Sequence, residues 1–313
     1  MIQATAPGKV ILFGEHAVVY GRPALAAPLS ELRARASIEE TGDPDILLAA
    51  SDFGWETRLA DAGPENPLVA VIRNFSMLTG RPIPAGIRIS VGSEIPIASG
   101  LGSGAAIAVA VIRALAGLTD KANPLGPGDV SRIAYEVERI HHGTPSGIDN
   151  TVIAFEMPVY FVRREPEDHI ESFSVAKPLR LLIGDTGQKS ATRGVVGDVR
   201  RQWESDRRRF EEIFDGCGRV AMAGRAAMAS GDLEKVGSLM NENHDWLTRM
   251  TVSSASLDKL VAAARRAGAL GAKLSGAGRG GNMIALVTSE TESAVRQGLT
   301  DAGAVRVYSS DVG

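Results

Sequence analysis

The spacing of apolar residues along the chain predicts a mixture of strands and helices. Short apolar or alternating runs favour strands, and apolar residues three or four positions apart favour helices. In the first half the pattern predicts strands at 10–13, 32–39 and 86–91, and helices at 67–78, at 107–115 and from 128 to a stop at Gly143. The chain has no internal repeat. The sequence therefore predicts an α+β fold.

The second half has the same character, and a charged, proline-containing break at 164–168 interrupts the pattern. The expected strands are 158–163, 179–184, 272–274, 283–287 and 305–308. The expected helices are 197–214, 220–229, 233–247, 256–267 with Ser256 as its N-cap, and one more between the last two strands. We place a domain boundary at the break, which gives an N-terminal domain over 1–168 and a C-terminal domain over 169–313.

Composition narrows the class of protein. The chain has 313 residues, of which 44% are hydrophobic, enough for two modest domains or one large one. Its net charge of -3, with both signs well mixed, argues against a nucleic-acid surface. A single cysteine, Cys217, excludes a disulfide framework and fits a reducing compartment. The first residues lack the pattern of a signal peptide, and the longest apolar runs are too short to span a membrane. We therefore expect a soluble, cytoplasmic protein.

A glycine- and serine-rich segment, 96–106, leads directly into the apolar helix expected at 107–115. Such a loop can turn several backbone N–H groups inward at the positive end of a helix, which is a way of holding phosphate. The alternative is a tight turn before a core helix. No lysine follows in the Walker spacing, so that type of phosphate loop is excluded. A formal match to the dinucleotide fingerprint is interrupted by Pro96, and its acidic residue would be Asp120 in a loop-like stretch.

A second glycine cluster, 273–282, precedes the strand expected at 283–287. A strand rather than a helix follows it, so no helix dipole is available there. It is either a hairpin or bulge loop, or a loop that packs close beside a ligand.

Charged residues flank two apolar segments. Lys9 precedes the strand at 10–13, and Glu15 and His16 follow it. Asp149 lies in a polar turn between a helix and an apolar stretch, where it either caps the turn or is a carboxylate held at a site. The adjacent histidines 141 and 142 face different sides of a helix and have no third ligand at a suitable spacing, which argues against a metal site.

Three motifs in order, 7–9, 96–106 and 273–282, closely resemble those of the superfamily of galactokinase, homoserine kinase, mevalonate kinase and phosphomevalonate kinase (GHMP kinases). The resemblance covers the whole chain. Within the superfamily, 8–21, 143–150 and 185–193 are most similar to the mevalonate kinases. The resemblance to this superfamily implies an N-terminal domain like domain 2 of ribosomal protein S5, with a left-handed crossover, and a ferredoxin-like C-terminal domain.

The resemblance also implies a reaction, the transfer of the γ-phosphoryl group of ATP to the 5-hydroxyl of mevalonate with Mg²⁺, on the route to isoprenoids. Asp149 would accept the hydroxyl proton or orient the hydroxyl, and Lys9 would stabilise the attacking oxygen and hold Asp149 ionised. The phosphates would lie on Pro96, Gly100, Leu101, Gly102, Ser103, Gly104, Ala105 and Ala106. Mg²⁺ would bind Ser103 and Glu138, and mevalonate would contact Glu15, His16, Thr192, Gly276 and Ala277. A monomer or homodimer without a nucleic-acid or membrane partner is expected.

Some positions depart from the family pattern or leave alternatives open. Gly104 replaces the usual second serine, so Ser103 or water would have to substitute for its hydroxyl. Arg279 and Asn282 stand where glycine and cysteine are frequent, and Arg279 either touches phosphate or is solvated. Helical geometry alone does not choose between Glu136 and Glu138. Two other functions stay open, a sister kinase for a substrate such as phosphomevalonate and a nucleotide sensor without turnover.

Overall fold

The computed structural model describes all residues except 51, 53, 97–99, 143–145, 167 and 189–191, and the side chains of 141, 142, 192 and 193. The chain forms two compact units. The first contains Met1–Lys9 and most of the chain from Leu32 to Glu156, and the second contains Val10–Glu31 and Met157–Gly313. The domain boundary expected at 168/169 stays a prediction.

The first unit is built on a sheet in which residues 32–39 and 87–91 alternate between buried and more exposed positions. It contains β3 (Ile46–Ala50), β4 (Trp55–Arg58) and β5 (Ile87–Ser93). It also contains the first part of β1 (Ile2–Phe13), as far as Lys9, and the part of β2 (Ala24–Glu40) from Leu32 onward. β5 lies between β2, to which it is antiparallel, and β3, to which it is parallel. β4 continues the sheet beyond β3, and β1 pairs with β2.

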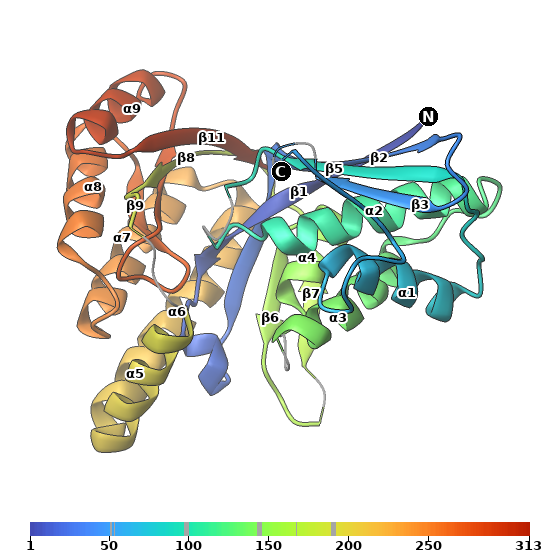
Figure 1. Cartoon of the computed structure of the whole chain (residues 1–313). Coiled ribbons are helices and arrows are strands. Elements are labelled where there is room, and N and C mark those ends of the chain that lie inside the picture. The colour runs from blue at the N-terminus through green and yellow to red at the C-terminus, as the bar shows by residue number, and fades with distance from the viewer. Residues whose placement is uncertain (51, 53, 97–99, 143–145, 167, 189–191) are drawn as a thin grey trace. The chain divides into compact units, whose positions relative to one another are not determined.

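Four helices cover one face of this sheet (Figure 1). They are α1 (Pro67–Thr79), α2 (Ser103–Thr119), α3 (Pro127–His142) and α4 (Ile148–Phe155). Asn66 caps α1 by accepting a hydrogen bond from the N–H of Leu68, and Pro67 occupies its first turn. α2 is the most apolar of the four, and its buried alanines and valines allow it to pack closely against α3 and α4.

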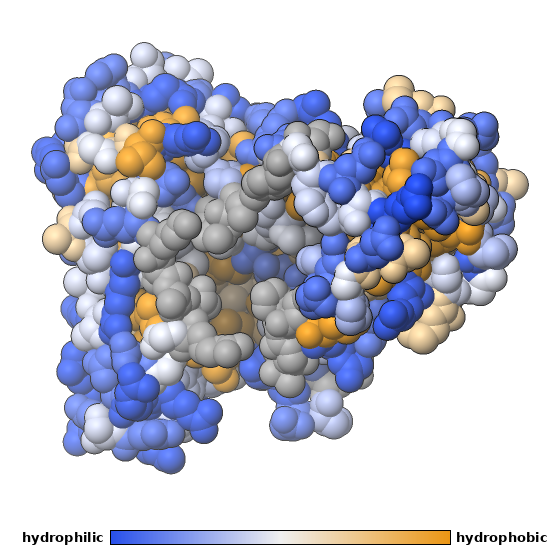
Figure 2. Space-filling view, in the orientation of Figure 1, coloured by the Kyte–Doolittle hydropathy of each residue, from blue (hydrophilic) through white to orange (hydrophobic). Residues whose placement is uncertain are grey.

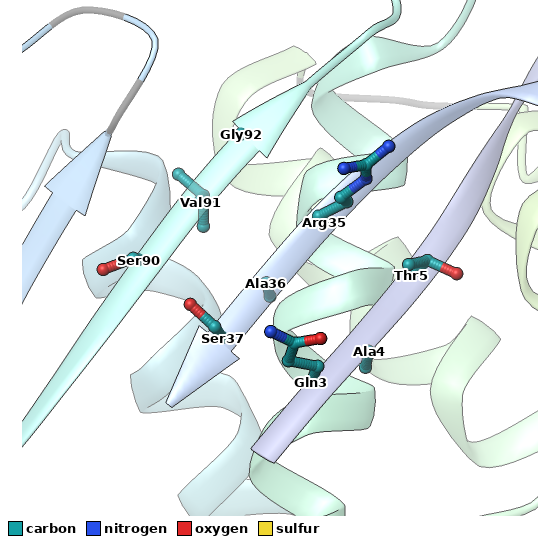
Figure 3. Close-up of a pocket in the computed structure, with 9 residues that line it drawn as sticks. All are labelled: Gln3, Ala4, Thr5, Arg35, Ala36, Ser37, Ser90, Val91 and Gly92. Carbon is teal, nitrogen blue, oxygen red and sulfur yellow. The ribbon is translucent and has the colours of Figure 1, made fainter. Parts of the chain in front are cut away.

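The strands also carry a cavity of about 270 Å³, lined by polar and apolar residues of β1, β2 and β5 (Figure 3). Its polar side chains come from Gln3, Arg35, Ser37 and Ser90, among others. Arg35 forms an ion pair with Glu94, and both side chains are at least half exposed. The cavity therefore lies among solvated polar groups, as expected for a sheet with one covered face.

The second unit contains an antiparallel four-stranded sheet in the order β11-β8-β10-β9, in which Ile183 of β8 lies opposite Ile284 and Tyr308. These strands are β8 (Leu179–Asp185), β9 (Gly271–Ser275), β10 (Asn282–Val287) and β11 (Arg306–Val312). Its helices are η1 (Ala17–Tyr20), α5 (Thr192–Ser205), α6 (Arg207–Ser230), α7 (Leu233–Arg249), α8 (Ala255–Arg266) and α9 (Glu292–Asp301). Two short strands, β6 (Val159–Val162) and β7 (His169–Ser172), extend from the start of β2.

The α+β class is confirmed, and several local predictions are corrected. Asp149 lies in the first turn of α4 and not in a polar turn. The helix expected at 197–214 is divided at Asp206, whose carboxylate accepts from the N–H of Arg209 and starts α6. α6 then runs on through the gap expected between 214 and 220. The N-cap of α8 is Ser254 rather than Ser256. The predicted stop at Gly143 lies outside the described residues.

On the face shown in Figure 2, hydrophilic residues predominate and apolar residues appear as separate spots. Among the helices of the described part of the chain, none is long and apolar enough to cross a membrane.

Candidate active site

Lys9 and Asp149 form an ion pair in the first unit. Nζ of Lys9 lies 3.1 Å from Oδ1 of Asp149, and the two side chains are 10% and 31% exposed. Lys9 extends from β1, and Asp149 lies in the first turn of α4, where the positive end of the helix favours a carboxylate. Because Lys9 is nearly buried, its charge is only partly screened by water. The pair therefore places a cation against a carboxylate that is open enough to accept a hydrogen bond from a hydroxyl group.

The glycine-rich loop packs directly against Lys9. The N–H of Lys9 donates to the carbonyl of Leu101 at 2.9 Å. Gly102 has φ +76°, and a Cβ placed on it would lie 2.8 Å from Cγ of Lys9 and 3.2 Å from Ile153. Only glycine fits here, because of both its backbone conformation and its distance from Lys9. α2 begins at the next residue, Ser103, so its N-terminal N–H groups lie beside the ion pair.

A mostly apolar cavity of about 230 Å³ lies at the start of α2. It is lined by Pro67, Leu68, Val71, Gly104, Ile107, Ala108, Val137 and Glu138. A Cβ on Gly104 would meet no atom within 4 Å. Glu138 is the acidic residue of this lining, whereas Glu136 pairs with Arg139 on the same helix at 3.0 Å. The arrangement thus places Glu138, and not Glu136, in the cavity with Gly104.

Ser103 is the hydroxyl residue at the helix start. Its Oγ lies 3.5 Å from Oγ of Ser93, at the end of β5. Ser103 and Glu138 both offer oxygen ligands, the kind that Mg²⁺ prefers. Among the described residues, no group of three His, Cys, Asp or Glu side chains is arranged to hold a metal ion. A magnesium ion would therefore need phosphate oxygens and water as further ligands, which is its usual mode of binding.

In the second unit, Glu15 is buried and forms an ion pair with the fully buried Lys273 of β9. Nδ2 of Asn243 donates to the other carboxylate oxygen of Glu15 at 3.2 Å. The ammonium of Lys273 also donates to the carbonyl of Leu274 at 2.7 Å. Burial lowers the pKa of Lys273, against the opposing effect of Glu15. Each of the two buried charges therefore has an opposite charge and a further hydrogen bond, which offset the cost of removing it from water.

The next residue, His16, contacts the second glycine cluster. It has φ 59°, which is strained for a residue with a side chain. Its Nε2 lies 2.9 Å from the carbonyl of Ala277, and since a carbonyl only accepts, Nε2 carries the proton. Burial lowers the pKa of His16, and the charge of Arg279 lowers it further against the opposing bond to Ala277. His16 is therefore held as a neutral imidazole on the loop that contains Gly276 and Ala277.

The loop between β9 and β10 is fixed by several bonds inside the second unit. N–H and Oγ1 of Thr186 both donate to the carbonyl of Gly281, at 2.9 and 2.8 Å. Arg279 pairs with Asp198 of α5, and its Nε donates to the carbonyl of Thr251 at 3.2 Å. Arg279 is thus engaged with protein groups and is one third exposed. Thr192 begins α5, and its side chain lies outside the described part.

Sequence reasoning missed the partners that support Glu15. Lys273 stands inside an apolar strand, Gly271–Ser275, and a lysine in that setting is a usable signal for a buried ion pair. Asn243 lies on α7, far along the chain from Gly14 and Glu15, and no sequence pattern identifies it.

Comparison with known proteins gives consistent matches. A model of the GHMP kinases N terminal domain matches residues 66–156, and one of the GHMP kinases C terminal matches residues 225–305. The mevalonate kinase of Thermococcus sibiricus is 36% identical over 98% of this chain and 95% of its own length. That of Pyrococcus abyssi is 36% identical over 91% of this chain and 88% of its own.

Solved structures agree with these relatives. The crystal structure of L. major mevalonate kinase in complex with R-mevalonate has a TM-score of 0.85, with 30% identity over 99% of this chain and 95% of that one. The Methanococcus jannaschii mevalonate kinase has a TM-score of 0.85, with 27% identity over 99% and 98%.

Proposed function

The chain belongs to the GHMP kinase family, and we propose that it is a mevalonate kinase, which transfers the γ-phosphoryl group of ATP to the 5-hydroxyl of (R)-mevalonate. The observation that carries the proposal is the Lys9–Asp149 pair beside the first glycine-rich loop. Phosphoryl transfer depends mainly on positioning and on neutralising charge, and this arrangement supplies both.

Asp149 is the group that receives or orients the proton of the 5-hydroxyl. Its carboxylate is nearly one third exposed, so a substrate hydroxyl can reach it, while Lys9 holds it from the buried side. As the 5-hydroxyl oxygen attacks, the ammonium of Lys9 stabilises the negative charge that develops on that oxygen. The Lys9–Asp149 pair therefore orients the 5-hydroxyl and helps it to lose its proton during the attack.

ATP is held by the loop and the cavity at the start of α2. The backbone N–H groups of Gly102, Ser103, Gly104 and the residues that follow receive the phosphates, helped by the helix dipole. The apolar part of the cavity suits the base, because a purine ring is flat and mostly buried in such sites. Ser103 and Glu138 are the protein oxygens for Mg²⁺, which neutralises phosphate charge when bound.

His16 and the loop with Gly276 and Ala277 are further contacts for mevalonate in this proposal. With its Nε2–H donating to Ala277, the neutral His16 has Nδ1 left to accept a hydrogen bond from an alcohol. Glu15 is already engaged by Lys273 and Asn243, so it contributes by fixing the turn that presents His16. Thr192 is a further substrate contact in this proposal.

An acceptor screen tests the proposal. The purified protein is incubated with ATP and Mg²⁺ and, separately, with mevalonate, phosphomevalonate, homoserine or galactose, and ADP is measured. We expect turnover with mevalonate and a loss of at least about 100-fold in the Asp149→Asn variant. Turnover of phosphomevalonate instead would show a sister kinase. ATP binding without turnover of any acceptor would show a nucleotide sensor.

A further inference from the structure

An arginine far from the phosphate loop connects the three elements that carry the reacting groups. Arg113 lies ten residues after Ser103 on α2, and its guanidinium reaches two other elements. Nη1 donates to the carbonyl of Thr5 on β1 at 2.7 Å. Nη2 donates to the carbonyl of Ala154 on α4 at 2.9 Å. Lys9 lies on the same strand as Thr5, and Asp149 on the same helix as Ala154.

A carboxylate completes this connection. Oε1 of Glu156, the C-cap of α4, accepts from Nη1 of Arg113 at 2.6 Å. Both oxygens of Glu156 also accept from Arg33 of β2 at 3.0 Å, and Arg33 donates through Nε to Oγ1 of Thr5 at 3.0 Å. Glu156 ends α4 in the left-handed conformation, with φ 51°, as C-cap residues often do. Arg33 and Arg113 thus both bind β1, at Thr5, and the end of α4, at Glu156.

We propose that Arg113 is a positioning residue, which fixes β1 and α4 against α2 and so sets the separation of Lys9, Asp149 and the phosphate-binding helix start. The inference rests on the proposed function. The planar guanidinium fork suits this task, because its donors have fixed directions and hold several acceptors at once. Arg113 holds these elements through two backbone carbonyls and the Glu156 carboxylate, so its role is to position the reacting groups rather than to contact them. Small displacements of reacting groups lower the rate of the chemical step strongly, so its loss appears in kcat.

The test compares Arg113→Met and Arg113→Lys with a matched control, Arg81→Met. Arg81 is also an arginine of the first unit, and it too holds a carbonyl, that of Asn123, at 2.8 Å. Its partners, Asn123 and Asp120, lie beyond the far end of α2. We expect Arg113→Met to lower kcat by about 10- to 100-fold while the KM values for ATP and mevalonate change less than about threefold. Arg113→Lys should keep more of the parent kcat than Arg113→Met does. Arg81→Met should keep kcat within about twofold of the parent, even if its melting temperature falls as much as that of Arg113→Met.

The inference fails if Arg113→Met loses no more kcat than Arg81→Met, or if its whole loss is in KM. Should Arg113→Met not fold, Arg113→Lys and Glu156→Gln carry the same test, and an unchanged kcat in both would overturn it. If the parent protein turns over a different alcohol, the proposed function fails, while the kcat ratio measured with that alcohol still decides the role of Arg113. A parent inactive toward every alcohol would overturn both.

Discussion

Lys9 Nζ and Asp149 Oδ1 lie 3.1 Å apart, although β1 and α4 are separated by more than a hundred residues of chain. In the described part of the glycine-rich loop, Gly102 lies against the Lys9 side chain. A cation, a carboxylate and a helix start therefore converge within one unit. Substitutions of the ion pair and of the loop glycines should therefore change the reaction rate or the binding of MgATP in predictable ways.

Removing either member of the pair should reduce the rate of phosphoryl transfer. For Asp149→Asn and Lys9→Met we expect kcat to fall by about 10²- to 10⁴-fold, because proton transfer and stabilisation of the attacking oxygen are lost. Steady-state kinetics measure this, with Asp129→Asn as the control, since Asp129 lies in the first turn of another helix, α3, and is exposed. Variants of the pair that keep kcat within about threefold would contradict the assigned roles.

Gly104→Ser should be accommodated and should improve the binding of MgATP. The added side chain enters open space in the cavity that Glu138 lines. One further hydroxyl contact is worth about 0.5–1.5 kcal/mol, which lowers the KM for MgATP by about 2- to 10-fold. Helix propensity also favours serine over glycine by roughly 0.5 kcal/mol, so the melting temperature does not fall. Gly102→Ser is the contrasting variant, and it should inactivate the protein because its Cβ collides with Lys9. A KM for MgATP that rises in Gly104→Ser would count against this account of the cavity.

The buried pair in the second unit should contribute strongly to stability only as a pair. Lys273→Met leaves the Glu15 carboxylate buried without its cation and should cost about 3–5 kcal/mol of unfolding free energy. Glu15→Gln should cost a similar amount. The double variant should cost much less than the sum of the two, because no uncompensated charge is left. Denaturant unfolding of the four proteins measures this coupling, and strict additivity would show that the two groups do not interact.

His244 should make the protein less stable as the pH falls. Burial lowers the pKa of His244 from 6.5 to about 4, and the N–H of Leu274 donates to its Nδ1 at 3.3 Å. The folded protein therefore keeps the imidazole neutral while the unfolded chain takes up a proton below pH 6.5. The resulting stability is complete above pH 6.5 and is lost progressively down to pH 4, by about 3 kcal/mol at most.

Melting temperatures measured between pH 4 and 7 test this expectation. His244→Asn keeps an acceptor for Leu274 and should give a shallower dependence on pH over that range. His169→Asn is the control, since His169 is exposed on β7. An unchanged slope in His244→Asn would contradict the proposed origin of the effect.

The sequence predicted the long periodic elements well, because helices such as α1 and α7 carry their signal in many residues. It missed β3, β4 and β7, which are only four or five residues long, and β7 is exposed along its whole length. It also missed α4, whose polar start looks like a turn until the rest of the unit packs against it.

The residues of the candidate site also fall into those that the sequence could predict and those that it could not. Local patterns identified the glycine-rich loops, and the family resemblance selected Lys9, Asp149 and Glu138. Neither could identify Lys273 as the partner of Glu15, or Arg113 as the link between strand and helices, since these contacts join residues distant in the chain. Such contacts arise only from the tertiary fold.

The most direct test of the central claim is phosphorus NMR of the product formed from mevalonate, ATP and Mg²⁺. We expect a new phosphate monoester whose signal is split by the two protons of the C5 methylene, and we expect no such signal with the Asp149→Asn variant. An unsplit signal, from phosphate on the tertiary 3-oxygen, would contradict the proposed orientation of mevalonate at Asp149. No consumption of mevalonate by a protein that binds ATP would contradict the proposed function itself.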